Sequence, residues 1–331
     1  MRLEGLNPVE YEHPEDTAGL EALENIPGVR DVALKIWETW LDKQLLFEST
    51  ASYVEIKDSN SKRLYGLFRT ACEILDFKDI PPFYLMNDQD GNIQAMAQGV
   101  NRPFVSISYG CVERFNDQEM LWLIGHELGH IKSGHVLYRS IARQFEQYFK
   151  KLGSLSLGLS NLAALPAEAI NVAMNYWSRM SELTSDRAGL LVCRDIDTAV
   201  TGIIKLAGFP SNDCSRISYL EINQFIDTFK EQARDFKSFE KEEFNKLVRY
   251  YVTSGKSHPW NVLRASELLK WIDSGDFDRI LKRERILVEE IDNNKLDSMP
   301  FDSKFCPNCG ATITQGIKFC ATCGTKVNKG T

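Results

Sequence analysis

The residue types best suited to chemistry are concentrated in the stretch Ile-Gly-His-Glu-Leu-Gly-His, residues 124–130. The apolar residues around this stretch predict a helix, and helical residues four apart share a face, so His126 and His130 point at one spot. Two imidazoles on one face form half of a Zn²⁺ site, and Glu127 between them is placed to act as a general base on a zinc-bound water. The alternative is a pair of satisfied histidines on a buried core helix.

A zinc site needs at least one more ligand, and a later segment supplies a candidate. Residues 166–193 are predicted to form a helix with a proline in its first turn, and Glu182 and Asp186 share one of its faces. Two carboxylates on an otherwise apolar helix are usually a solvated stripe. Beside a histidine pair, however, Glu182 would bind the metal, and Asp186 would accept the outer N–H of a zinc-bound histidine and so fix its tautomer.

The three remaining histidines give weaker signals. His135 lies five residues after His130, and this spacing rotates its side chain off the face of the helix that carries the ligands. The metzincin pattern would need a histidine at position 136, which is Val136. We therefore expect that His135 does not bind the metal. His258 precedes a proline and is therefore held in extended geometry that can aim the ring into a cleft, with Arg264 six residues later. His13 lies in an acidic, proline-containing stretch and is expected at the surface.

Four of the eight cysteines form a second metal signal near the end of the chain. They make two C-x-x-C pairs, each followed by glycine: Cys306, Cys309, Cys320 and Cys323. This pattern is typical of a structural Cys₄ zinc site, and because so short a tail cannot fold on a core alone, the metal supplies its folding energy. We expect the tail to dock to a protein partner or to act as a structural cap, with nucleic-acid contact as the lesser alternative. The other four cysteines are expected to be small buried hydrophobes in a reducing compartment.

A short sheet is expected just before the motif helix. Three strand-like pieces separated by turn residues predict a small β-meander: 82–86, 93–97 and 104–108. The middle piece has small side chains around Ala95–Ala97, so it could be a flat edge strand that binds an extended peptide by β-augmentation, or an ordinary edge strand. Asn116 followed by Glu119 resembles a capping box and predicts the start of the motif helix.

Charge and hydropathy restrict the environment of the protein. The net charge of −7 and the pI of about 5.4 argue against a general nucleic-acid binder. The N-terminus lacks the apolar core of a secretory signal, so the expected location is the cytoplasm. The Leu-rich residues 152–165, between the two halves of the zinc site, fall short of the roughly 20 apolar residues that span a bilayer. We interpret residues 139–165 as a hairpin or lid, with peripheral membrane contact through 152–165 as the alternative.

Taken in order, these motifs resemble the HtpX-like and CAAX-prenyl-protease-like zinc metallopeptidases, family 48 of the metallopeptidases, which are of the gluzincin type. The resemblance rests on residues 116–135, 181–189 and the His-Pro dipeptide with its following arginine. It implies that His126, His130 and Glu182 are zinc ligands and that Glu127 is the base, with Asp186 behind a ligand. It also implies that His258 and Arg264 line the cleft and support the transition state. Many members of that family have transmembrane helices, and no such helix is evident here.

The expected fold is α+β and predominantly helical, with a zincin-like metallopeptidase core. We expect the following division: a peptidase domain over 1–291, with N-terminal helices in 1–78 and the catalytic core in about 80–265, a linker over 292–304 and a zinc ribbon over 305–331. The expected function is that of a soluble zinc endopeptidase with one catalytic and one structural Zn²⁺ and a protein or peptide substrate. The alternatives are a non-catalytic scaffold that recruits partners through the ribbon, and a protease kept latent by its N-terminal helices or by residues 139–165.

Overall fold

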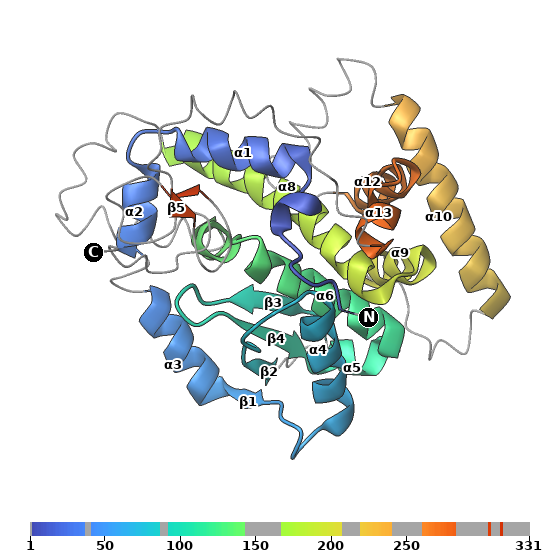
Figure 1. Ribbon diagram of the computed structural model, residues 1–331, viewed down its shortest axis with the longest axis horizontal. Coiled ribbons are helices and arrows are strands. Elements are labelled where there is room, and N and C mark those ends of the chain that lie inside the picture. Colours follow the sequence, from blue (N-terminus) through green and yellow to red (C-terminus); the bar gives the residue numbers. More distant parts are fainter. Residues whose placement is uncertain are drawn as a thin grey trace.

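The fold is predominantly helical, with a small sheet on one side, as expected for the α+β class (Figure 1). The computed structural model describes these residues: 2–36, 41–86, 92–142, 167–206, 219–239, 260–282, 304–305 and 312–313. Within these ranges, no helix combines the length and the apolar character that crossing a bilayer requires. The predicted membrane contact at 152–165, His258 and the four tail cysteines lie outside the described residues. Of the predicted lid, 139–165, the structure describes only residues 139–142, which are helical.

The central element is α6 (Asp117–Lys132), which contains the motif histidines. It begins with the predicted capping box: the Asn116 side chain accepts the backbone N–H groups of Gln118 and Glu119, and the Glu119 carboxylate accepts the N–H of Asn116 at 2.9 Å. The same carboxylate receives a 2.7 Å ion pair from Lys205. Every residue from Glu119 to His130 is buried, so α6 is enclosed on all sides.

The long helix α8 (Ala167–Cys193) packs antiparallel against α6, and glycines allow the two backbones to approach closely. A Cβ added to Gly125 would lie 2.7 Å from a methyl carbon of Val192, and one added to Gly129 would lie 2.6 Å from the Cβ of Ala188. Both glycines therefore serve the contact with α8, and they bring the face that carries the motif histidines directly onto this helix.

Four strands form a mixed sheet in the order β1-β2-β4-β3: β1 (Tyr53–Glu55), β2 (Phe83–Met86), β3 (Ala95–Gln98) and β4 (Phe104–Ser108). The three predicted strands are present, and β3 lies at an edge as expected. The simple meander is wrong, because β2 and β4 are parallel neighbours, with Phe83 opposite Val105, and β1 adds a fourth strand. All five residues of β4 are buried, so this strand needs hydrogen-bonding partners on both edges, which β2 and β3 provide.

The N-terminal region supplies the helices that flank this centre: η1 (Pro8–Glu10), α1 (Pro14–Glu24), α2 (Val29–Ile36), α3 (Asp42–Ser52) and α4 (Lys62–Ile74). Helix α1 lies along α8 (Figure 1), where Gly19 faces Trp177. Helix α4 packs on α6 and on the sheet, where the ring centroids of Phe68 and Phe83 are stacked 4.3 Å apart. The N-terminal chain is thus part of the same packed body as α6 and α8.

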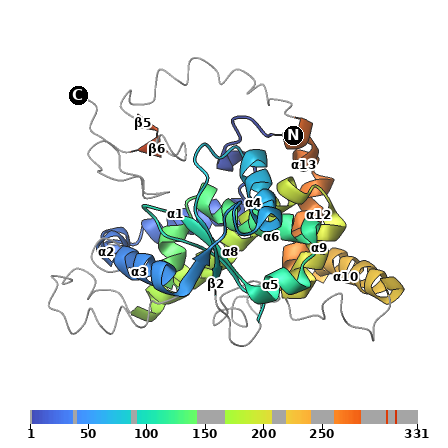
Figure 2. The ribbon, with the colours of Figure 1, turned by 90° about the horizontal axis from the view of Figure 1, so that it is seen from below.

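The remaining helices are α5 (Tyr109–Arg114), α9 (Ile196–Leu206), α10 (Tyr219–Phe239), α12 (Asn261–Asp273) and α13 (Asp276–Lys282). Helices α9 and α12 pack on α8, and α10 and α13 pack on α12 (Figure 2). The short strands β5 (Lys304–Phe305) and β6 (Thr312–Ile313) form an antiparallel pair.

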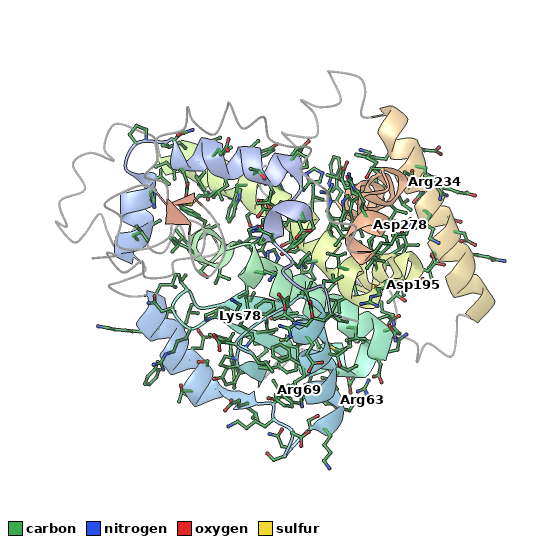
Figure 3. All side chains as sticks on the ribbon, in the orientation of Figure 1. Arg63, Arg69, Lys78, Asp195, Arg234 and Asp278 are labelled. Carbon is green, nitrogen blue, oxygen red and sulfur yellow. The ribbon has the colours of Figure 1, made fainter. Side chains whose placement is uncertain are left out.

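Charged side chains such as Arg63, Arg69 and Arg234 lie on the outer surface, where hydration favours them (Figure 3). The contact between α6 and α8 departs from this pattern. It buries histidines, carboxylates and arginines together, and side chains of these types are rarely buried unless they are paired with one another or bind a metal.

Candidate metal centre and active site

Three side chains at the α6–α8 contact place one ligand atom each around a common point. Nε2 of His126 lies 3.4 Å from Oε2 of Glu182, and Nε2 of His130 lies 3.5 Å from Oε1 of the same carboxylate. The three ligand atoms are within 4.8 Å of one another, and all three residues are buried. Ligands held at about 2.0–2.2 Å from a tetrahedral zinc ion lie about 3.3 Å from each other, so the spacing fits this ion.

The state of the ligand atoms also fits a metal. Nε2 of His130 is buried and makes no hydrogen bond within the part of the chain that the structure describes. Such orphaned buried nitrogens are rare, because each loses its hydration without compensation. Two imidazoles and one carboxylate are the ligand set of many catalytic zinc sites, in which the fourth position stays open for water or substrate.

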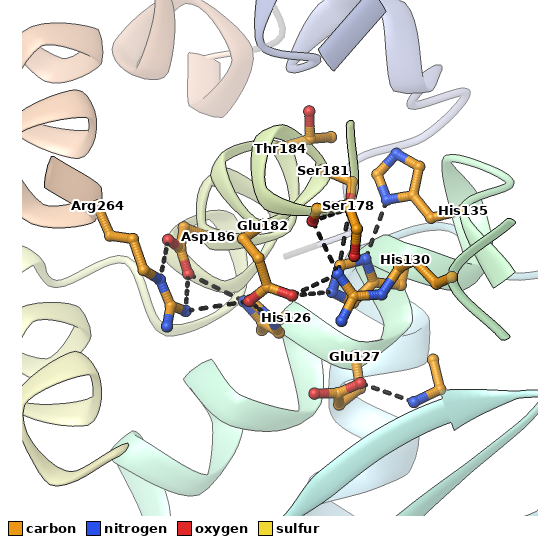
Figure 4. Close-up of polar contacts among 12 residues, drawn as sticks. His126, Glu127, His130, His135, Ser178, Ser181, Glu182, Thr184, Asp186 and Arg264 are labelled. Atoms are coloured by element: carbon orange, nitrogen blue, oxygen red, sulfur yellow. Dashed lines mark hydrogen bonds and ion pairs between the residues drawn. The ribbon is translucent and has the colours of Figure 1, made fainter. Parts of the chain in front are cut away.

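The outer nitrogen of His126 is held by a carboxylate, as predicted (Figure 4). Nδ1 of His126 lies 2.9 Å from Oδ1 of Asp186. Arg264 donates two hydrogen bonds to Asp186, from Nε at 2.8 Å and from Nη2 at 2.6 Å. Burial acts to raise the pKa of Asp186, but Arg264 and His126 outweigh it and hold that pKa below its usual value. Asp186 therefore accepts the Nδ1–H of His126, so Nε2 is the nitrogen that faces the metal position.

Arg264 lies behind the ligands and is only 2% exposed. Its guanidinium donates hydrogen bonds to Asp186 and lies 3.8 Å from Oε2 of Glu182. Sequence reasoning had placed Arg264 at the cleft together with His258. The structure brings Arg264 to the carboxylates of Asp186 and Glu182, whereas His258 lies outside the described residues.

A second arginine, Arg139, had no sequence signal and also contacts Glu182. It forms an ion pair with Oε1 of Glu182 and donates to the backbone oxygen of Ser178 at 3.2 Å and to the hydroxyl of Ser181 at 3.1 Å. Burial, and next the positive charge of Arg139, hold the pKa of His130 well below its usual value. Burial likewise opposes protonation of His126, but Asp186 and Glu182 outweigh it and raise the pKa of His126 to about 9.

The outer nitrogen of His130 has a partner that the sequence did not reveal. Nδ1 of His130 lies 3.0 Å from Nδ1 of His135, and Nε2 of His135 lies 2.9 Å from Oδ2 of Asp16 in α1. His135 offers no atom to the group of ligand atoms. It lies instead directly behind a ligand, where it connects α6 to the N-terminal helix.

The expectation that His13 lies at the surface is wrong, because its side chain is buried. His13 is the N-cap of α1: its Nδ1 accepts the backbone N–H of Glu15 at 3.2 Å. Its Nε2 lies 3.1 Å from Oε2 of Glu267 in α12. The acidic, proline-containing composition that indicated exposure belongs to the first turn of a docked helix, where acidic residues and proline are favoured.

Glu127 occupies a different face of α6 and points at the sheet (Figure 4). Its Oε2 accepts the backbone N–H of Ala97 in β3 at 2.7 Å. The register of β3 explains this contact: the oxygen of Gln94 accepts the N–H of Ser108 in β4, so alternate residues, including Ala97, direct their backbone groups to the open edge. The carboxylate thus lies between the ligand atoms and the free edge of the sheet.

Comparisons with known proteins agree with this geometry. Residues 60–272 match Peptidase family M48, and residues 305–327 match a zinc-ribbon domain. The chain is 29% identical over 281 residues to the plastoglobule-localized metallopeptidase 48 of Arabidopsis thaliana, a match that covers 84% of this chain and 76% of the relative. It is 30% identical over 104 residues to a protease HtpX homolog of Bacteroides fragilis, about 31% of each chain. It is 20% identical over 197 residues to protease HtpX homolog 2 of Methanosarcina mazei, which covers 53% of this chain and 66% of that one.

No solved structure gives a significant match. The family match is sufficient on its own, because it covers most of the chain and contains both halves of the metal site, from His126 to Glu182 and on to Arg264. The resemblance that the motifs indicated is therefore confirmed, as is the zinc ribbon behind the peptidase domain. The chain belongs to peptidase family M48, and it is a zinc metalloprotease with a C-terminal zinc-ribbon domain.

Proposed function

We propose that the chain is an endopeptidase whose catalytic Zn²⁺ is held by His126, His130 and Glu182. The observation that carries the proposal is the burial of these three ligand atoms within 4.8 Å of one another, next to Glu127 and the free edge of β3. Bound there, Zn²⁺ supplies a Lewis acid for the scissile carbonyl and activates a water molecule. A second Zn²⁺, held by Cys306, Cys309, Cys320 and Cys323, has a structural role in the ribbon.

Glu127 is the general base in this proposal. Its carboxylate accepts a proton from the attacking water and passes it to the leaving amine. The position of its carboxylate beside Ala97 supports this role, because a peptide bound along β3 would pass directly over it. The substrate would pair by β-augmentation with the outward backbone groups of β3 other than the N–H of Ala97, which Glu127 accepts. This pairing holds the substrate extended and is largely independent of side-chain identity.

The two arginines have positioning roles in this proposal. Both lie beneath the ligands, where Arg264 orients Asp186 and Arg139 orients Glu182. We assign Arg264 to this role in place of direct contact with the transition state, because its Nε and Nη2 donors are taken by Asp186. His258 stays the predicted group for transition-state contact.

The test is hydrolysis of an unfolded, fluorophore-labelled protein by the purified, zinc-loaded chain. Glu127→Gln keeps the size of the side chain and the acceptor for Ala97 but removes the base, so we expect kcat to fall by about 10²–10⁴-fold with the zinc content unchanged. Hydrolysis that persists in Glu127→Gln would refute the mechanism. A wild-type chain that holds both zinc ions and cleaves no unfolded protein would favour the scaffold alternative.

The location and the partners are proposed separately from the chemistry. The Arabidopsis relative is named for plastoglobules, and residues 152–165 carry the predicted membrane contact of this chain. Co-flotation with lipid vesicles, compared between the full chain and a variant with charged substitutions in 152–165, tests that contact. Failure of both to float would leave the predicted cytoplasmic location. The ribbon is proposed to bind a protein partner.

A further inference from the structure

We propose that the N-terminal segment completes the catalytic metal centre, with Asp16 acting through His135 to position the zinc ligand His130. The proposal rests on the metal site assigned above and concerns how that site is assembled. Asp16 lies outside residues 60–272, the part of the chain that matches the peptidase family. It therefore adds to this centre an element that the family match does not contain.

The direction of the hydrogen bonds follows from the requirement for a metal ligand. To bind a metal through Nε2, neutral His130 must carry its proton on Nδ1. That proton is donated across 3.0 Å to Nδ1 of His135, which must then carry its own proton on Nε2. Nε2 of His135 donates in turn across 2.9 Å to Oδ2 of Asp16. If His135 carried its proton on Nδ1, His130 would have to be protonated on Nε2 and could not bind zinc.

Asp16 is itself held in place by the helix that carries the third ligand. Its Oδ2 also accepts the hydroxyl of Thr184 at 2.5 Å, and the oxygen of Thr184 accepts the backbone N–H of His13 at 3.0 Å. Thr184 lies between Glu182 and Asp186 in the sequence of α8, and its side chain points away from theirs, on the opposite side of this helix (Figure 4).

Neighbouring residues hold the same segment against the helices that form the site. The hydroxyl of Tyr11 lies 3.1 Å from that of Ser133, directly after α6. Arg187 in α8 donates to the backbone oxygens of Tyr11 and of the following residue, and the ring of His13 contacts Glu267 in α12. Residues 11–16 therefore contact α6, α8 and α12 within six positions, and Asp16 is the one whose side chain contacts the His130–His135 pair.

The two zinc histidines are thus supported differently. Nδ1 of His126 contacts a carboxylate directly, whereas Nδ1 of His130 is connected to one through a second imidazole. Without Asp16, the Nε2–H of His135 would lose the acceptor that the structure shows for it, and the opposite tautomer, which blocks His130, would become competitive. Groups behind a metal ligand typically contribute 10–100-fold to metal affinity, and we expect a loss of about this size.

The test measures Co²⁺ and Zn²⁺ affinity by chelator competition in the full chain. The absorption bands of Co²⁺ distinguish the nitrogen–oxygen site from the four-cysteine ribbon. Asp16→Ala, which removes the acceptor, should weaken the first site by about 10–100-fold and leave the ribbon unchanged. Glu21→Ala, at an exposed acid on the same helix, is the matched control and should change neither site.

Tyr11→Phe separates positioning from general docking, because it removes one contact of the segment and leaves the His130–His135–Asp16 chain intact. If Tyr11→Phe weakens Co²⁺ binding as much as Asp16→Ala, the positioning role is overturned. In a double-mutant cycle, Asp16→Ala should add little to His135→Phe, since both break the same chain. Additive effects would also overturn it. None of these readouts needs hydrolysis. Wild-type binding at both sites with no effect of Asp16→Ala would therefore refute this inference alone, and a wild-type chain with only ribbon metal would refute the proposed function.

Discussion

Substitution of Gly129 by alanine should separate the two halves of the metal site without touching a ligand. The added Cβ would lie 2.6 Å from the Cβ of Ala188 and 3.2 Å from the Cα of Ser185. Carbon atoms in contact lie about 3.5–4.0 Å apart, so α6 and α8 must move about 1 Å away from each other. Neither of these two atoms belongs to the end of a flexible side chain, so the clash can be relieved only by a shift of the helix backbones.

The expected magnitude follows from the geometry of the ligands. Overpacking of this kind costs about 1–3 kcal/mol of stability, which a domain of this size can survive. A metal site tolerates ligand displacements of only about 0.2 Å, and His130 and Glu182 lie on opposite sides of the widened contact. We therefore expect a folded protein that has lost its catalytic zinc and its hydrolytic activity but has kept the zinc of the ribbon.

The assay combines metal analysis, thermal denaturation and hydrolysis of a labelled unfolded protein. Gly66→Ala is the matched control, because a Cβ there meets nothing within 4 Å in the middle of α4, and this substitution should stabilise the helix by about 0.5–1 kcal/mol with normal metal content. A Gly129→Ala protein with both zinc ions and wild-type activity would refute the view that the close approach of α6 and α8 sets the ligand geometry.

Three further predictions address the groups around the ligands and the core. Arg264→Lys keeps the positive charge but cannot donate two hydrogen bonds to the carboxylate of Asp186 in the same geometry. It should therefore lower the melting temperature, measured by calorimetry, and the zinc affinity, measured by chelator competition. Burial acts to raise the pKa of Glu267, but hydrogen bonds, first of all with His13, lower this pKa to about 2 from the usual 4.5. The ionised Glu267 therefore stabilises the fold fully above pH 4.5, and this stabilisation is lost as the pH falls toward 2. In Glu267→Gln, the free energy of unfolding measured with urea should consequently fall less steeply at acid pH. Burial raises the pKa of Cys72 and of Cys193 to about 12, so neither thiol should react with iodoacetamide at pH 8 in the native protein, as read by peptide mapping, and rapid labelling would contradict their burial.

Local patterns in the sequence were sufficient to predict the elements that carry the chemistry. The capping box at Asn116 and the four-residue spacing of His126 and His130 are properties of a single helix, and they are found as predicted. The same is true of Glu182 and Asp186 on α8, because a helix brings residues four apart onto one face whatever it packs against. The strand pieces were also evident from their composition.

Contacts between distant segments could not be predicted in the same way. The order of strands in the sheet depends on which edges of β4 are covered, and the three-residue β1 is too short to give a pattern. His135 was correctly placed off the ligand face, but its contact with Asp16 joins residues that only the docking of α1 brings together. His13 was misplaced for the same reason, since local composition does not indicate whether a capped helix end meets solvent or another helix.

The central claim is that one zinc ion is held by the α6–α8 contact and another by the ribbon, and counting zinc in the full chain tests it most directly. We predict about two zinc ions per wild-type chain and about one in Glu182→Ala, because that variant removes the ligand that closes the site between the two helices. Removal of residues 303–331 should likewise leave about one. A Glu182→Ala chain that keeps two zinc ions would contradict the account, since the third ligand would then lie elsewhere.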